Sequence, residues 1–180
     1  MTNKRRFTRK ERIAYHEAGH AVMAHILHKR IKGVSILPDK DIHTLGKFEQ
    51  GKSAKIDFSE TSPKTRYELE KQVMIDFAGE VVEYLLIGKF DKLTNIGSST
   101  DWHYAYDFIL TQTDYDVDES EAYAHWLWLR TKGELKIDYQ WNAIQVLAQE
   151  LIKRNYISGR YAREIIQQSI KDFSESLRAK

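Results

Sequence analysis

The sequence predicts one mainly helical domain with a small β element near its N-terminal end. The chain has 180 residues, of which 42% are hydrophobic and 12% aromatic, which is enough to form a buried core. It contains only 2 prolines and 9 glycines, so long helices are favoured over a sandwich of many strands. No repeat, low-complexity tract or linker divides the chain. We therefore expect a single domain over residues 1–180, with residues 1–7 as a flexible basic N-terminus.

The composition also narrows the possible functions. The formal net charge is +2, so nothing in the overall charge calls for nucleic acid or an anionic membrane as a partner. Cysteine is absent, which excludes disulfide bonds and leaves His, Asp and Glu as metal ligands. No apolar run approaches the roughly 20 residues of a membrane span, and none follows the basic N-terminus as in a secretory signal. We expect a cytoplasmic protein with no membrane span in this chain and no nucleic-acid partner.

The N-terminal half is predicted to contain two long helices with short strands between them. A capping box that begins at Thr8 predicts a helix that runs to about Lys29. Ser62 followed by Pro63 is typical of a helix start, and the apolar period of this second helix continues until Gly88. Three short β-prone runs lie between the helices, at residues 34–37, 45–49 and 54–58.

The C-terminal half is predicted to be helical. The Ser-Ser-Thr run at residues 98–100 provides an N-cap for a helix that continues to about Leu110. Three further apolar periods predict helices near residues 119–132, 139–154 and 159–177. The β element is therefore expected near the N-terminal end of the chain.

The first predicted helix carries the spacing His-Glu-x-x-His, from His16 through Glu17 to His20. Residues i and i+4 share one helix face, so both imidazoles can point at one metal ion. Glu17 follows the first histidine directly, which positions its carboxylate to take a proton from a water on that metal. Zinc lowers the pKa of such a water from about 15.7 towards 7. The motif therefore predicts a catalytic zinc site with Glu17 as general base.

A second interpretation of this motif is a helix with two partly buried, hydrogen-bonded histidines and no metal. With this composition, chance would produce the motif about once in fifty chains of this length. The helical context and the small residues Ala18 and Gly19 between the two histidines favour the zinc site.

The spacing leaves the third ligand open. Catalytic zinc normally has three protein ligands and one open position. Asp101 and His103 are the favoured candidates, because they begin a helix behind a Gly/Ser turn. The other candidates by chemistry are Asp76, Glu80, Glu83, Asp107 and His125.

Several stretches of the chain resemble the peptidase domain of the FtsH family of ATP-dependent zinc proteases. Ile13 to Val22, which contains the His-Glu-x-x-His spacing, resembles the start of that domain. Further matching stretches follow in the same order, at residues 34–38 with 45–46, 77–88 and 97–101, and a weaker one spans residues 143–166. Together they cover most of the chain.

The resemblance implies a zincin-like helical peptidase domain that hydrolyses unfolded or flexible polypeptides. It implies that His16, His20 and Asp101 bind Zn²⁺ and that Glu17 is catalytic. An aspartate suits this set, because its anionic oxygen complements two neutral imidazoles. Glu83 matches a glutamate of the family and either orients a zinc ligand or is an ordinary carboxylate of a helix surface.

The chain also departs from the family pattern. The family carries membrane segments and an ATPase module before the peptidase, and neither is present in this sequence. Residues 111–139 do not follow the family pattern either. ATP-driven unfolding is therefore not expected of this chain, which is either an excised domain or a stand-alone relative. A polypeptide substrate is the expected partner, and a separate ATPase or adaptor and a homo-oligomer are further partners that the resemblance allows.

Two other functions are weaker interpretations of the same sequence. Residues 46–53 match the Walker A expression, but no buried strand precedes them and no helix follows directly, so nucleotide binding is not expected. A non-catalytic relative that acts as a binding or assembly module is the main alternative. Glu17 argues against it, because a structural zinc site needs no base. If the chain is a peptidase, an edge strand such as Val34 to Leu37 is expected to pair with the substrate backbone.

Overall fold

The structure is a computed structural model that describes residues 6–38, 45–51, 62–88 and 100–179. It confirms a mainly helical fold with a minor β element. In chain order, the described elements are α1 (Arg9–Ile26), β1 (Ile31–Ser35), β2 (Lys47–Gln50), α2 (Pro63–Ile87), α3 (Thr100–Gln112), α4 (Val117–Leu135), α5 (Asp138–Arg154), β3 (Tyr156–Ser158) and α6 (Gly159–Arg178). The β-prone run at residues 54–58 lies outside the described residues.

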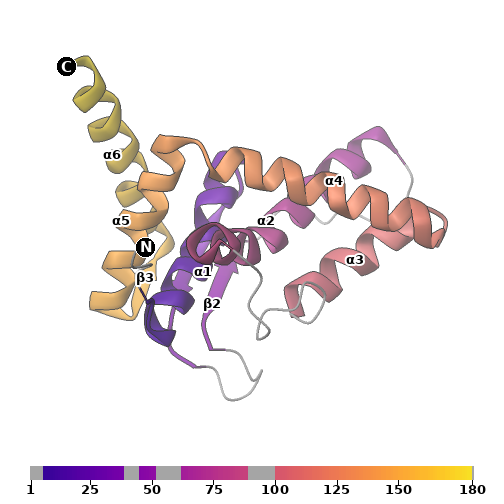
Figure 1. The fold of residues 1–180 in the computed structure, drawn as a ribbon, viewed down its shortest axis with the longest axis horizontal. Helices are drawn as coiled ribbons and strands as arrows, with labels where there is room; N and C mark the ends of the chain where they lie inside the picture. Colours follow the sequence, from indigo (N-terminus) through magenta and orange to yellow (C-terminus); the bar gives the residue numbers. More distant parts are fainter. Residues whose placement is uncertain (1–5, 39–44, 52–61, 89–99, 180) are drawn as a thin grey trace.

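Helices α1 and α2 form the centre of the molecule. Figure 1 shows α5 and α6 on one side of this pair and α3 and α4 on the other. Helix α1 packs on both α2 and α5, whereas α2 contacts α3 and α4. Among the described helices, none combines the length and apolar character needed to cross a membrane.

The predicted helix starts are formed by side-chain caps. Thr8 and Glu11 make both hydrogen bonds of a capping box at the start of α1. Ser62 caps α2 through the amide of Thr65, and Gly88 ends this helix in the left-handed conformation with φ of 76°. The predicted cap at residues 98–99 lies outside the described residues.

The sheet has three antiparallel strands in the order β2-β1-β3. Val34 of β1 lies opposite Phe48 on one side and Ile157 on the other. The expectation that residues 34–37 form an edge strand is therefore wrong, because β1 is the central strand and Leu37 lies beyond its end. Strand β3 was not predicted, since three residues between two helices are too few to show a strand period.

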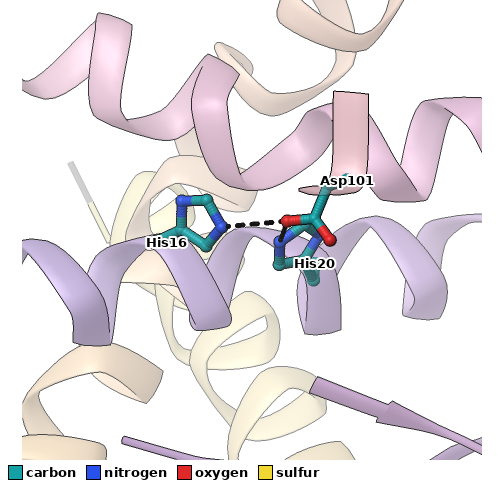
Figure 2. A group of neighbouring side chains, drawn as sticks. All are labelled: His16, His20 and Asp101. Atoms are coloured by element: carbon teal, nitrogen blue, oxygen red, sulfur yellow. Dashed lines mark hydrogen bonds and ion pairs between the residues drawn. The ribbon is translucent and has the colours of Figure 1, made fainter. Parts of the chain in front are cut away.

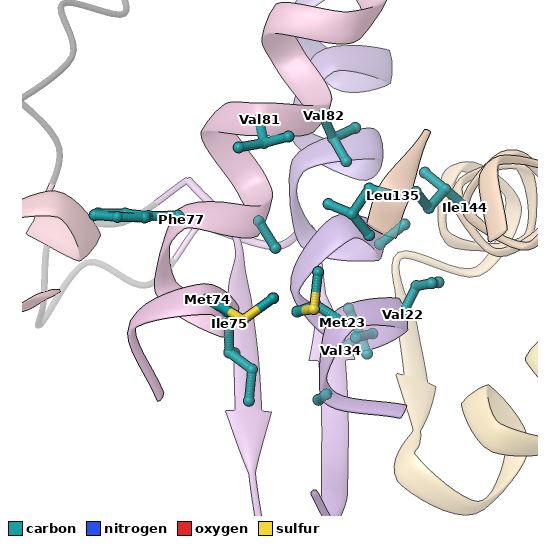
Figure 3. Close-up of a cluster of buried hydrophobic side chains, with 14 of the residues drawn as sticks. Val22, Met23, Val34, Met74, Ile75, Phe77, Val81, Val82, Leu135 and Ile144 are labelled. Atoms are coloured by element: carbon teal, nitrogen blue, oxygen red, sulfur yellow. The ribbon is translucent and has the colours of Figure 1, made fainter. Parts of the chain in front are cut away.

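The core lies where α1, α2 and β1 meet. Figure 3 shows Met23 of α1 and Met74 of α2 side by side, with Val34 of β1 near them, and Val22 and Ile75 belong to the same buried cluster. All five are at most 1% exposed. Burial of a side chain of this size stabilises a fold by about 1.5–3 kcal/mol.

Gly19 sets the close approach of α1 and α2. A Cβ atom at this position would lie 2.7 Å from Val82 Cγ2 and 2.8 Å from the carbonyl oxygen of Ala78. Since real Cβ atoms do not approach other atoms so closely, only glycine allows this packing. Gly19, inside the His-Glu-x-x-His motif, therefore serves helix packing. It allows α2 to lie directly against the two histidines.

Candidate metal centre and catalytic site

Helix α1 presents the three chemically active residues of the motif to the interior. The His20 and Glu17 side chains are almost fully buried, and the His16 side chain is 17% exposed. The two imidazole rings lie 4.7 Å apart between centroids, at an angle of 70°. The predicted i, i+4 arrangement is thus present, with both rings on the face of α1 that meets α2.

Asp101, in the first turn of α3, completes a group with the two histidines. Its Oδ2 atom lies 3.4 Å from His16 Nε2 and 3.5 Å from His20 Nε2, as Figure 2 shows. One donor atom from each of the three residues lies within 4.8 Å of the others. The carboxylate of Asp101, which lies 81 residues beyond His20 in the sequence, therefore meets the two imidazoles at one point.

The outer nitrogen of each histidine is held by α2. His16 Nδ1 lies 2.9 Å from Glu83 Oε1, and Arg12 Nη2 donates to Glu83 Oε2 at 2.8 Å. His20 Nδ1 lies 2.7 Å from the carbonyl oxygen of Ile75. A carbonyl only accepts, so His20 Nδ1 carries the hydrogen and Nε2 keeps its lone pair. Glu83 likewise accepts from His16 Nδ1, so in the neutral rings both Nε2 lone pairs point to the place where Asp101 lies.

Gly79 of α2 leaves space beside these lone pairs. A Cβ atom at position 79 would lie 2.5 Å from His20 Nε2 and even closer to His16 Nε2. Any larger residue would therefore push the two nitrogens away from their common point. Glycine inside a helix weakens it by about 1 kcal/mol relative to alanine, so its presence here has a local packing reason.

The Glu17 carboxylate lies between α1 and β2. The backbone amide of Phe48 donates a hydrogen bond to it, and the Phe48 ring stacks on His20 at 6.1 Å between centroids. A Cβ atom on Gly46 would approach Glu17 Oε1 to 2.5 Å. Burial raises the pKa of Glu17 above its ordinary value, which the neighbouring histidines partly oppose. A raised pKa suits a carboxylate that takes and returns a proton.

The charges within the site favour an ionised Asp101. Burial opposes charge on this carboxyl, but its contacts with His16 and His20 outweigh burial and hold the pKa of Asp101 well below its usual range. Burial likewise opposes protonation of the two imidazoles. Their contacts with Asp101, and for His16 also with Glu83, outweigh it and raise the pKa of both histidines.

The donor set fits a zinc ion. Imidazole nitrogen and carboxylate oxygen are ligands that zinc takes, and three protein ligands leave one position open, as in catalytic sites. The tautomers fixed by Glu83 and Ile75 direct Nε2 inward, and Gly79 leaves the room that these atoms require. Arg12, Gly79 and Phe48 were not predicted from the sequence as parts of the site. Gly79 carried a signal, because glycine in a helical period commonly marks close packing.

The other sequence candidates are not part of this donor group. In the part of the chain that the structure describes, the grouped donors are His16, His20 and Asp101, so His103 is not among them. Asp76 lies on α2, where it accepts a hydrogen bond from Gln72 at 2.8 Å, and burial raises the pKa of Asp76 to about 7. The remaining candidates outside the group are Glu80, Asp107 and His125.

The Walker-like stretch has the form of a strand where it is described. Residues 46–51 contain β2, which pairs with β1. A phosphate-binding loop instead leads from a strand into a helix N-terminus. Lys52 and Ser53 lie outside the described residues.

Comparison with protein-family models gave no match, and no curated protein proved significantly similar in sequence. The assignment of this site therefore depends on its own geometry and on the motif stretches in the sequence.

Proposed function

We propose that this protein is a zinc metalloendopeptidase that hydrolyses peptide bonds of unfolded or flexible polypeptides. One observation carries the proposal: His16 and His20 of α1 and Asp101 of α3 converge, with the buried carboxylate of Glu17 beside them. The resemblance of the motif stretches to the FtsH peptidase domain supports it. A metal-free pair of core histidines would need neither the converging aspartate nor the glycine at position 79.

Each residue has a defined task in this proposal. His16, His20 and Asp101 would hold the zinc ion, which supplies Lewis-acid activation of water and of the substrate carbonyl. Glu17 takes the proton of the attacking water and passes it to the leaving amine. Glu83 and the carbonyl of Ile75 accept from the two Nδ1 atoms and orient both imidazoles, so that the Nε2 atom of each ring would bind the metal.

Strand β2 is the proposed docking edge for the polypeptide. Among the described strands it pairs with β1 alone, and its residue Phe48 lies against Glu17 and His20. A polypeptide that adds to this edge would bring its backbone to the catalytic carboxylate. Pairing through the backbone requires an extended segment, and opening one in a folded protein costs up to its global stability of about 5–15 kcal/mol. Flexible chains are therefore the favoured substrates.

The test replaces Glu17 by Gln and measures zinc content and cleavage of a disordered polypeptide. Glu17→Gln should keep one zinc per chain and lose about a hundred- to ten-thousand-fold in cleavage rate, because an amide cannot take the proton. Glu175→Gln is the matched control, since this carboxylate is exposed on α6. Equal cleavage by the Glu17 variant would remove it from the mechanism. Zinc binding without cleavage by the unaltered chain would favour a non-catalytic binding module.

A further inference from the structure

A cleft of about 790 Å³ opens between α3 and α4, outside the metal centre. Figure 1 shows these two helices side by side, joined by the short turn that follows α3. Trp102 and Tyr106 of α3 form one wall, four residues apart and therefore on one helix face. The other wall is the face of α4 that carries Asp118, Glu121, Ala122, His125 and Trp128. The volume lies in the range of cavities that bind small molecules or side chains.

The aromatic wall offers flat π surfaces. The Trp102 ring stacks on Phe77 at 4.7 Å and lies parallel to Tyr106, with 6.4 Å between centroids and an angle of 12°. Phe77 is buried in the core, so the stack is anchored at its inner end. Aromatic faces attract cations within about 6 Å of the ring centre. A cation–π contact of this kind is present on α4, where the Arg130 guanidinium lies 5.4 Å from the centre of the Trp126 ring.

The acidic wall supplies the complementary charge. Asp118 and Glu121 both line the cleft, and neither makes an ion pair among the residues that the structure describes. Asp118 lies in the first turn of α4, where the helix dipole alone accounts for an acidic residue. Glu121 lies one turn further and has no such explanation. Glu121 lines the same cleft as Tyr106, and burial, followed by the charge of Glu121, raises the pKa of Tyr106.

We infer that the α3–α4 cleft is a subsite for an arginine side chain of the polypeptide substrate. A guanidinium group stacks on indole and phenol rings and at the same time donates to carboxylates, which matches the two walls better than a lysine ammonium. Trp102 directly follows the metal-site residue Asp101, and adjacent residues point about 100° apart on a helix. The cleft therefore begins at the residue next to a proposed zinc ligand, on a neighbouring face of α3. This inference rests on the proposed peptidase function for the identity of the ligand.

Binding can be tested without catalysis. The chain has 4 tryptophans, of which Trp102 and Trp128 line the cleft, whereas Trp126 and Trp141 do not. Their indole N–H signals can be followed by NMR while N-acetyl-arginine amide is added, with the neutral isostere N-acetyl-citrulline amide as comparison. The Trp102 and Trp128 signals should shift with arginine and respond about fivefold more weakly to citrulline, as expected for loss of a cation–π contact.

Two double variants sharpen this test. Asp118→Asn with Glu121→Gln should abolish the difference between arginine and citrulline. Glu119→Gln with Glu175→Gln removes the same charge from exposed positions that do not line the cleft, and should preserve the difference. Shifts of all four indole signals, or equal responses to arginine and citrulline, would overturn the inference.

The zinc-loaded protein then tests the role of the cleft in cleavage. Two flexible fluorogenic peptides that differ only by arginine or citrulline should differ about fivefold in kcat/KM, and the Asp118→Asn, Glu121→Gln variant should lose this preference. Selective indole shifts with no cleavage of either peptide would leave the arginine site standing while the peptidase function fails. Cleavage without a preference for arginine would show that the cleft does not act on the substrate and would overturn the inference.

Discussion

The two sides of the proposed metal centre are built in different ways. His16 and His20 belong to one helix, and each outer nitrogen is fixed by a group of α2. Asp101 comes from a different helix, and its side chain is 42% exposed. Among the described residues, Asp101 makes its ion pairs with the two imidazoles. The histidine side is therefore organised by helix geometry and core packing, whereas the aspartate side depends on the docking of α3 and on charge.

The largest expected effects come from replacing one proposed zinc ligand on each side, His20 or Asp101, with alanine. His20→Ala should weaken zinc binding by about a hundredfold or more, because each ligand carries a large share of the binding free energy. It should also lower the stability of the metal-free protein by about 1–3 kcal/mol, because the buried ring leaves a cavity and its hydrogen bond to the Ile75 carbonyl is lost. Asp101→Ala should weaken zinc binding comparably and leave the metal-free stability nearly unchanged at pH 8.

Chelator competition and thermal unfolding of both variants measure this difference. If Asp101→Ala binds zinc as tightly as the unaltered chain, the third ligand lies elsewhere. If both variants lose the same stability, the histidine side is no more firmly organised than the aspartate side.

The space beside the histidines can be filled by one methyl group. Gly79→Ala should reduce zinc affinity at least tenfold, because its Cβ atom displaces the two Nε2 atoms. Gly133→Ala in α4 is the matched control, since a Cβ atom there meets no atom within 4 Å. The control should keep zinc binding and gain up to about 1 kcal/mol of stability from helix propensity. Unchanged zinc affinity in Gly79→Ala, measured by the same competition, would mean that the site does not need this space.

Replacing Glu83, the α2 residue that holds His16, should weaken zinc binding less than replacing a zinc ligand. Glu83→Gln is expected to weaken zinc binding by about ten- to a hundredfold, because a neutral amide orients His16 less firmly and makes its Nε2 less basic. Glu70→Gln serves as control: this carboxylate lies on the same helix and binds Arg130 and Tyr123 instead. Equal zinc affinities of the two variants would reduce Glu83 to an ordinary helix carboxylate.

The smallest expected effect is a pH dependence near neutrality. Zinc must displace any proton on the two imidazoles, and the pKa of both lies above the ordinary 6.5. Zinc affinity should thus fall as the pH drops, and because both pKa values are raised the fall should begin above pH 6.5. The metal-free protein should behave oppositely: the stability from the protonated histidines is present below pH 6.5 and is lost as the pH rises through their raised pKa values.

Zinc titrations and metal-free unfolding between pH 6 and 8.5 measure the two trends. A zinc affinity that does not change over this range would contradict the raised pKa values of His16 and His20.

The sequence by itself determined the features that depend on neighbouring residues within one helix. Side-chain caps at Thr8 and Ser62 marked helix starts, and the i, i+4 spacing placed His16 and His20 on one face with Glu17 beside them. These features depend on residues within about one helical turn of each other, and helix geometry is the same wherever a helix occurs.

Only the tertiary structure decided which distant residues meet the histidines. Position in the sequence favoured both Asp101 and His103, and the family resemblance implied Asp101; the docking of α3 is what brings Asp101 to the Nε2 atoms. The docking of α2 likewise brings Gly79 and Glu83 to α1, and pairing with β3 turns β1 into a central strand. Such contacts depend on how whole elements pack, because the spacing between residues far apart in the chain fixes neither their distance nor their orientation.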